Sequence, residues 1–404
     1  MVVGLTTFAQ IATVMGIAVF PVIAPKLAVE MGVEPSLIGF QMSLVYGAAM
    51  LSAPFSTWMV TCYGACRAIQ TGLLFSMIAL LLPLQSGLAA LVMASILLGA
   101  AMSVMTPAAA HILFRFSPPR HRNLLFSIKQ TCVPAGWMIV ALVAPPIALQ
   151  FGWQWAIVAV MVFTVLMTVA LQPLRAVWDN DRSPSAGGVR QQAREGLSLL
   201  WHQAELRWLS LASMFMSGVQ LCLSSFAVTM LVQEAGYDLV AAGLMLSVAQ
   251  AAGVTGRIVW GWIADRHGNC LVLLIRLSAV MMACCLVMAL LTPQWPRGMT
   301  GALFLVFGAS AIGWNGLFLA EVARLSPPGK VSVATSGAMA WNFAGILIGP
   351  ALFAVIYRFN GSYASTFGWL TIFALGGFAS LLLCAASARR TPRTASGTRN
   401  GAPT

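Results

Sequence analysis

Apolar runs of twenty or more residues recur from one end of the chain to the other, and they restrict its fold more than any other feature. Each run is long enough to cross about 30 Å of hydrocarbon as an α-helix. Because lipid offers the backbone no hydrogen-bond partners, runs of this length that cross it are helical. Only 8% of the 404 residues are charged, whereas soluble domains contain about 25%. The sequence therefore predicts an all-α integral membrane protein.

Twelve transmembrane helices are expected, separated by breaks that contain Gly, Pro or polar residues. Their approximate ranges are 3–25, 38–60, 68–86, 88–114, 124–149, 155–174, 208–232, 240–262, 271–291, 299–320, 331–357 and 364–387. They divide into an N-terminal six-helix bundle over 1–174 and a C-terminal six-helix bundle over 207–388, joined by a linker over 175–206. The tail over 389–404 is rich in Arg, Thr, Ser and Gly and is expected to be disordered.

Basic residues are distributed unequally between the two predicted sides of the membrane. Sixteen of the 22 Lys and Arg residues fall on the side that carries the linker and both termini, whereas only Lys26, Arg297 and Arg358 fall on the other. This positive-inside pattern predicts a multi-pass protein of the inner (plasma) membrane with both termini in the cytoplasm. Topology accounts for most of the net charge of +12, so the lipid bilayer is an expected partner and nucleic acid is not.

The two halves of the sequence resemble each other. When residues 39–66 are aligned with residues 243–270, at an offset of 204 positions, six residues are identical. A second echo places Arg115-Phe-Ser-Pro-Pro119 after the fourth span and Arg324-Leu-Ser-Pro-Pro328 after the tenth. Duplicated halves of this kind place a substrate site at their interface near the middle of the bilayer, and the halves rock around it.

The stretch Gly261-Trp-Ile-Ala-Asp265-Arg266-His-Gly268 resembles the G-x-x-x-D-R-x-G signature of the major facilitator superfamily, in the copy between spans 8 and 9. The number of spans, the linker and both echoes agree with that family over nearly the whole chain. The resemblance implies the family's fold, transport by alternating access, and a cytoplasmic gate that contains Gly261, Asp265, Arg266 and Gly268. The alternative for these residues is a simple hydrophilic turn with a positive-inside Arg.

The first half departs from the family pattern. Thr61 and Cys62 stand where the usual Asp and Arg of the signature would be, and Ser95 stands where many proton-driven relatives carry an Arg. These differences put the first-half lock and the proton-antiport relay of exporters in doubt. They argue against a drug exporter without excluding one.

Ionisable groups inside predicted spans are costly to bury and are candidates for function. The deep ones are Arg257 in span 8, Lys129 in span 5 and Glu321 in span 10. Two cations and one acid give the interior a net positive charge, which favours an anionic substrate. Glu321 precedes Arg324 by three residues, a spacing that predicts an intrahelical or gate ion pair. Glu321 and Asp265 are also the candidates for coupling to a proton.

Arg257 lies about 12 Å inward from Asp265 at the helical rise. The spacing Arg257-x-x-x-Gly261-x-x-x-Asp265 resembles the eighth span of monocarboxylate and oxalate:formate carriers, in which an Arg holds the substrate carboxylate. Lys129 and Gln130 belong to Ser-Ile-Lys-Gln-Thr, which resembles a stretch of cyanate- and nitrate-type permeases. The alternatives are an Arg257 that satisfies backbone carbonyls or steadies the Asp265 turn, and a snorkelling Lys129.

Uncharged polar residues in the spans complete the candidate substrate site. Those selected are Gln10, Gln220, Gln250, Trp314 and Asn315. The alternative for each is a hydrogen bond to a neighbouring helix, which is the more frequent use of polar residues in membrane spans.

These features predict a secondary active transporter, monomeric and without cofactor or metal, that moves a small organic anion of the carboxylate type with a proton. The rival within transport is a proton-coupled exporter of drugs or amphipathic metabolites. A membrane-embedded enzyme is disfavoured because no His or acidic cluster has metal-binding spacing and no G-x-S-x-G is present. A sensor that kept the fold and lost transport is a third possibility.

Overall fold

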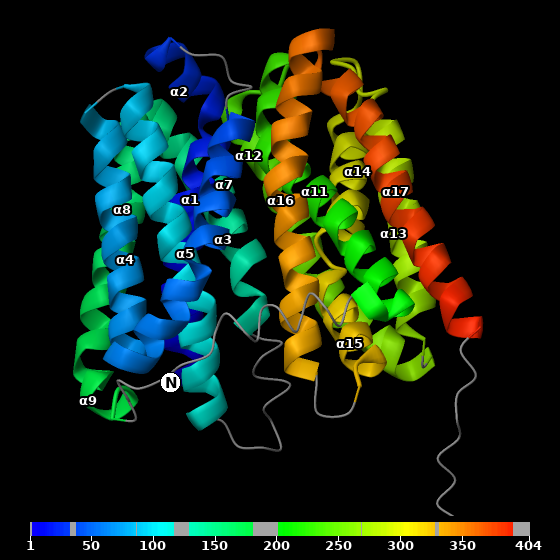
Figure 1. Cartoon of the computed structure of the whole chain (residues 1–404). Coiled ribbons are helices and arrows are strands. Elements are labelled where there is room, and N and C mark those ends of the chain that lie inside the picture. The colour runs from blue at the N-terminus through cyan, green and yellow to red at the C-terminus, as the bar shows by residue number, and fades with distance from the viewer. Residues whose placement is uncertain are drawn as a thin grey trace, which may run out of the picture.

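The computed structural model describes residues 2–32, 38–85, 87–116, 129–180, 201–267, 269–327 and 331–390 (Figure 1). Within these ranges the regular structure is entirely helical. Eleven segments are long and apolar enough to cross a membrane, and the 26-residue helix α3 occupies the place of the twelfth. The predicted all-α membrane fold is confirmed.

The first half of the chain forms one bundle of helices, drawn in blue to green in Figure 1. Its helices are α1 (Val2–Val22), α2 (Ala24–Met31), α3 (Ile38–Tyr63), α4 (Ala65–Leu81), α5 (Leu88–Phe116), α7 (Cys132–Gln150), α8 (Trp153–Leu171) and α9 (Arg175–Trp178). The linker side of the molecule is the end at which α1 begins and α9 lies, and the far side is the end that carries α2.

The second half forms the other bundle, drawn in green to red in Figure 1. Its helices are α11 (Ala204–Gln233), α12 (Leu239–His267), α13 (Cys270–Met288), α14 (Arg297–Ala311), α15 (Asn315–Leu325), α16 (Val331–Asn360) and α17 (Tyr363–Arg390). The bounds of the linker and of the tail differ from the sequence prediction. Helix α9 and the start of α11 lie inside the predicted linker, and Arg389 and Arg390, assigned to the tail, continue α17.

The two halves meet along two pairs of helices. In one pair, the Ser43 hydroxyl of α3 donates to the Leu347 carbonyl of α16 at 2.7 Å. In the other, α7 packs against α12 so closely that a Cβ on Gly243 would lie 2.3 Å from the Ala141 carbonyl oxygen. Glycine at this position therefore lets the backbones of the two halves touch.

The tenth span is broken, whereas the sequence predicted one continuous helix over 299–320. Helix α14 ends at Ala311 and α15 begins at Asn315, with a turn between them. Trp260 of α12 fills the space beside the turn: its Nε1 donates to the Ala309 carbonyl at 2.8 Å, and a Cβ on Gly313 would lie 2.9 Å from that nitrogen. Side chains of α12 therefore satisfy carbonyls that a break leaves without helical partners.

A Gly308→Ala substitution tests the packing of α14 against α12. A Cβ at Gly308 would lie 2.0 Å from the Ala249 carbonyl oxygen, so the helices must separate, at a cost of about 1–3 kcal/mol. We expect a lower midpoint of thermal unfolding in detergent. Gly298→Ala on the same helix is the control, because a Cβ there meets nothing within 4 Å. Equal midpoints for the two variants would contradict the packing described.

Candidate functional site

Arg257 extends from α12 to the boundary between the two halves. Its Nε donates to the Ile312 carbonyl in the broken tenth span at 3.2 Å, and its Nη1 donates to the Gln130 carbonyl of the other half. No carboxylate pairs with it among the side chains that the structure describes. The predicted alternative of an arginine that satisfies backbone carbonyls is thus observed, and the guanidinium still has no counter-ion in the described part of the chain.

Lys129 lies one turn before α7 and is 2% exposed. Its ammonium makes no hydrogen bond with the described residues. Lys129 directly precedes Gln130, the residue whose carbonyl accepts from Arg257 Nη1. A buried cation of the first half and a partly buried cation of the second half therefore lie near the boundary between the halves.

The predicted residues Gln220, Trp314 and Asn315 come together in one neutral cluster of the second half. The Gln220 side-chain carbonyl accepts from Trp314 Nε1 at 3.2 Å and from Asn315 Nδ2 at 3.0 Å. Asn315 Nδ2 also lies 3.4 Å from the Ile312 carbonyl oxygen, the same atom that Arg257 contacts. The cluster and the guanidinium are therefore neighbours across one backbone carbonyl.

Gln10 and Gln250 are packed in the protein interior, each with 2% exposure or less. Gln250 donates to the Ser224 hydroxyl at 3.0 Å. Gln10 is 3.5 Å from the Thr106 hydroxyl, and its own carbonyl oxygen has no partner within the described residues. Both side chains contact hydroxyl groups of neighbouring helices. Their part in substrate binding stays a prediction.

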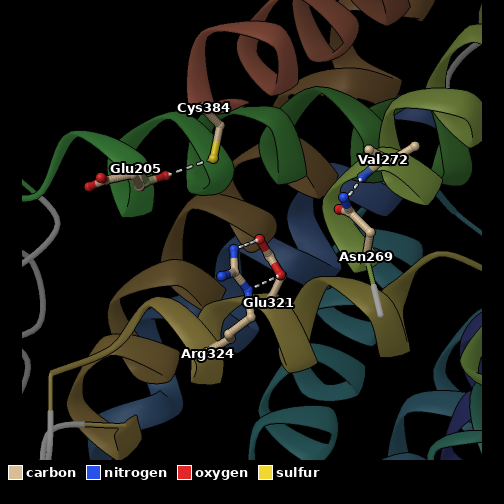
Figure 2. A network of polar contacts seen from close by, with 6 residues as sticks. All are labelled: Glu205, Asn269, Val272, Glu321, Arg324 and Cys384. Carbon is tan, nitrogen blue, oxygen red and sulfur yellow. Dashed lines mark hydrogen bonds and ion pairs between the residues drawn. The ribbon is translucent and has the colours of Figure 1, made fainter. Parts of the chain in front are cut away.

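Glu321 and Arg324 form the ion pair that their spacing predicts (Figure 2). The guanidinium grips the carboxylate with two hydrogen bonds, from Nε at 2.8 Å and from Nη2 at 2.5 Å. Glu321 is 1% exposed, whereas the side chain of Arg324 is 44% exposed. The pair lies beside the end of α17, where the Cys384 thiol donates to the Glu205 carbonyl at 3.4 Å.

The predicted gate residues at the end of α12 are only partly described. Gly261 lies within the helix, and a Cβ there meets nothing within 4 Å. Arg266 is exposed, with its guanidinium carbon 5.3 Å from the centre of the Trp262 ring. The Asp265 side chain and Gly268 lie outside the described structure, so the gate-lock stays a prediction.

The sequence analysis missed Asp179, which follows α9. Its carboxylate accepts from the backbone N–H groups of Cys66 at 2.7 Å and Arg67 at 3.2 Å. It thereby caps the start of α4, where Gly64 offers no side-chain cap. Burial raises the pKa of Asp179, and the two N–H groups, with Arg175 and Arg67, act in the opposite direction.

The site combines two helical halves, a broken span and cations at the boundary between the halves, and this arrangement is typical of polytopic two-bundle membrane carriers. The chain belongs to the Major Facilitator Superfamily, whose family profile matches residues 6–350. This membership favours a transporter over the membrane-embedded enzyme considered above.

Individual similar proteins agree with the family. Two uncharacterized MFS-type transporters of Mycobacterium tuberculosis, from strains CDC 1551 / Oshkosh and ATCC 25618 / H37Rv, are each 25% identical over 174 residues. That alignment covers 42% of this chain and 37% of each relative, so the chain spans little more than a third of their length.

Solved structures share the fold over nearly the whole chain. A peptide transporter POT in complex with sulfate is similar with a TM-score of 0.75 at 16% identity, covering 96% of this chain and 94% of that one. A bacterial homolog of the human lysosomal transporter Spinster, in an inward-facing and unoccupied conformation, gives 0.67 at 16% identity, covering 96% and 95%.

An Asp179→Ala substitution tests the cap of α4. Loss of the acceptor for the Cys66 and Arg67 N–H groups should destabilise the protein by about 1 kcal/mol. The thermal unfolding midpoint in detergent should fall, and Asp179→Asn should recover part of the loss because its amide oxygen still accepts a hydrogen bond. An Asn variant no better than the Ala variant would show that the negative charge, and not the hydrogen bonds, stabilises this end of α4.

Proposed function

We propose that the chain is a secondary carrier that moves a small organic anion of the carboxylate type by alternating access, coupled to a proton. The observation that carries this proposal is a pair of cations, one buried and one partly buried, at the boundary of the halves. Arg257 contacts the carbonyl of Gln130, the residue next to Lys129, and neither cation has a carboxylate partner among the described side chains.

Charge supplies the physical reason. A buried charge without a counter-ion is costly, and attraction between opposite charges is strong where the dielectric constant is low. An anion between Lys129 and Arg257 would offset the cost of both cations. Arg257 Nη2 has no protein partner within the described structure, so the guanidinium keeps a donor with which to hold a carboxylate.

The surroundings of the two cations suit the rest of a small substrate. Substrate sites in carriers with duplicated halves form where broken helices expose backbone groups near the bilayer midplane. The break at 312–314 adjoins Arg257, and the amides of Gln220 and Asn315 lie beside it. We propose that these neutral groups contact the uncharged part of the substrate.

Proton coupling is assigned to Glu321. It is a deeply buried carboxylate of the second half, and Arg324 grips it with two hydrogen bonds. Uptake of a proton would remove the charge and weaken that grip, which links protonation to the position of α15. Asp265 remains the second candidate on the strength of the family resemblance.

The rival function, export of drugs or amphipathic metabolites, has one observation in its favour. An apolar groove of about 740 Å³ lies between α3, α5 and Leu347 of α16. Its wall contains the exposed side chains of Leu44, Leu51 and Ile96. The groove shares no residue with the cationic site. Apolar compounds that bind in the groove should therefore not compete with a carboxylate for the cationic site, and a competition assay distinguishes the two functions.

The proposal includes an orientation. With the linker side in the cytoplasm, Arg67, Arg115 and Arg175 of the first half and Arg324 of the second lie at the cytoplasmic surface, as the positive-inside rule requires. We further propose that the protein is a monomer of the inner (plasma) membrane.

Uptake into proteoliposomes tests the anion site. Labelled small carboxylates should accumulate with the wild-type protein, and Arg257→Gln should reduce kcat/KM at least tenfold because one charge-assisted contact is worth about 1.5–3 kcal/mol. Lys129→Gln should reduce it similarly. Arg276→Gln is the matched control, since that arginine lies on the neighbouring helix α13 of the same half but is exposed. Carboxylate transport that is unchanged in both cation variants would refute the assignment.

A Glu321→Gln substitution tests proton coupling. The amide cannot titrate, so the variant should lose accumulation driven by a pH gradient while it keeps carboxylate exchange across the membrane. The two readouts are gradient-driven uptake and counterflow, measured on the same vesicles. Accumulation that still follows the pH gradient in this variant would assign coupling elsewhere, with Asp265→Asn as the next variant.

A further inference from the structure

We infer that Arg257 is a latch between the two halves and that the anionic substrate opens it by taking the place of the Gln130 carbonyl. The second part of this inference rests on the proposed function, whereas the first part does not. The contact that carries it joins Arg257 Nη1 of α12 to the backbone of the other half.

The two carbonyls that Arg257 contacts are not equivalent. Ile312 belongs to the same half as α12, and Trp260 independently fastens the neighbouring Ala309 carbonyl to α12. These contacts can travel together as one body. Gln130 belongs to the first half, so its contact with Arg257 must break whenever α12 moves away from α7.

The other contacts along the same pair of helices are neutral. The Ser247 hydroxyl lies 3.3 Å from the Met138 carbonyl oxygen and also donates within its own helix to Gly243 at 2.9 Å. Its hydrogen bond is therefore satisfied whether or not the halves touch. Arg257 differs, because separation of the halves removes the Gln130 carbonyl and leaves a charged donor without that partner in a site of low dielectric constant. The guanidinium contact thus holds the empty carrier in this arrangement.

A carboxylate supplies the differential interaction that a conformational change requires. Hydrogen bonds between two ionised groups are stronger than those from an ion to a neutral carbonyl. Lys129, whose ammonium has no hydrogen bond with the described residues, directly precedes Gln130 in the chain, so an anion that reaches both cations draws the guanidinium away from Gln130. The bound anion then replaces the lost carbonyl, and the halves separate without stranding the charge.

Distances between spin labels on the two halves test the latch. Val29 of α2 and Phe359, in the last turn of α16, are 81% and 88% exposed. Helix α2 and that end of α16 lie at the far side (Figure 1). Cysteines at these positions, labelled in lipid nanodiscs, give the distribution of distances between the halves. Without any anion, Arg257→Gln should change the population ratio of the conformations in which the halves touch and separate along α7 and α12. The expected change is about tenfold or more, because the variant loses one charge-assisted hydrogen bond.

Three variants make the result specific. Arg276→Gln, which removes an exposed arginine on the neighbouring helix α13 of the same half, should leave the anion-free distribution unchanged. Trp260→Phe removes the bond to Ala309 within one half and should also leave it unchanged. Arg257→Lys keeps the charge and guards against misfolding, and it should give a shift between those of the wild type and Arg257→Gln. An anion-free distribution that is identical in the wild type and both Arg257 variants overturns the latch.

The second part of the inference is read from the wild type with and without acetate, lactate, oxalate and malonate at millimolar concentration. At least one should shift the distribution toward that of Arg257→Gln. A carboxylate that is transported in an Arg257-dependent manner, with no shift in any distribution, overturns the latch and keeps the anion site. A shift in anion-free Arg257→Gln with no carboxylate bound or transported keeps the latch and overturns the anion-carrier function.

Discussion

The absence of water from the bilayer interior is the constraint on which this structure depends, because every backbone carbonyl there needs a donor from the protein. The broken tenth span creates such a need at Ala309 and Ile312, and α12 meets it with Trp260 and Arg257. A cation is an effective donor for this purpose, but it brings a charge into a site of low dielectric. Arg257 therefore does two things at once: it donates to the Ile312 carbonyl at the break, and its charge favours a bound anion.

The corresponding helices α4 and α13 of the two halves have different N-terminal caps. In the first half the carboxylate of Asp179, which follows span 6, caps the start of α4. A side chain at Gly64 would collide with that carboxylate, since a Cβ would lie 2.3 Å from it. In the second half Asn269 caps α13 from its own first turn, by accepting from the Val272 N–H at 3.1 Å. The loss of Asp and Arg from the first-half signature is thus accompanied by an acid supplied from a distant part of the chain.

The sequence predicted what short-range patterns determine and missed what distant contacts determine. The spans follow from the length of each apolar run, and the Glu321–Arg324 pair follows from helical spacing. The break before Asn315 was missed because Trp260, which accommodates it by donating to the Ala309 carbonyl, lies on another helix. Asp179 was missed for the same reason, since its partners Cys66 and Arg67 are more than a hundred residues away. The contact of Arg257 with Gln130, the residue next to Lys129, likewise required the packing of the two halves.

Because the cations lie at the boundary, their affinity for an anion depends on how the two halves are arranged. A cation buried wholly inside one bundle would hold an anion equally well in every orientation of the halves, and binding that is equal in two states shifts nothing. Arg257 instead changes its surroundings when α12 leaves α7, because Gln130 stays with the other half. The free energy of the guanidinium therefore depends on the conformation of the carrier, and a ligand that pairs with it acts on that conformation directly.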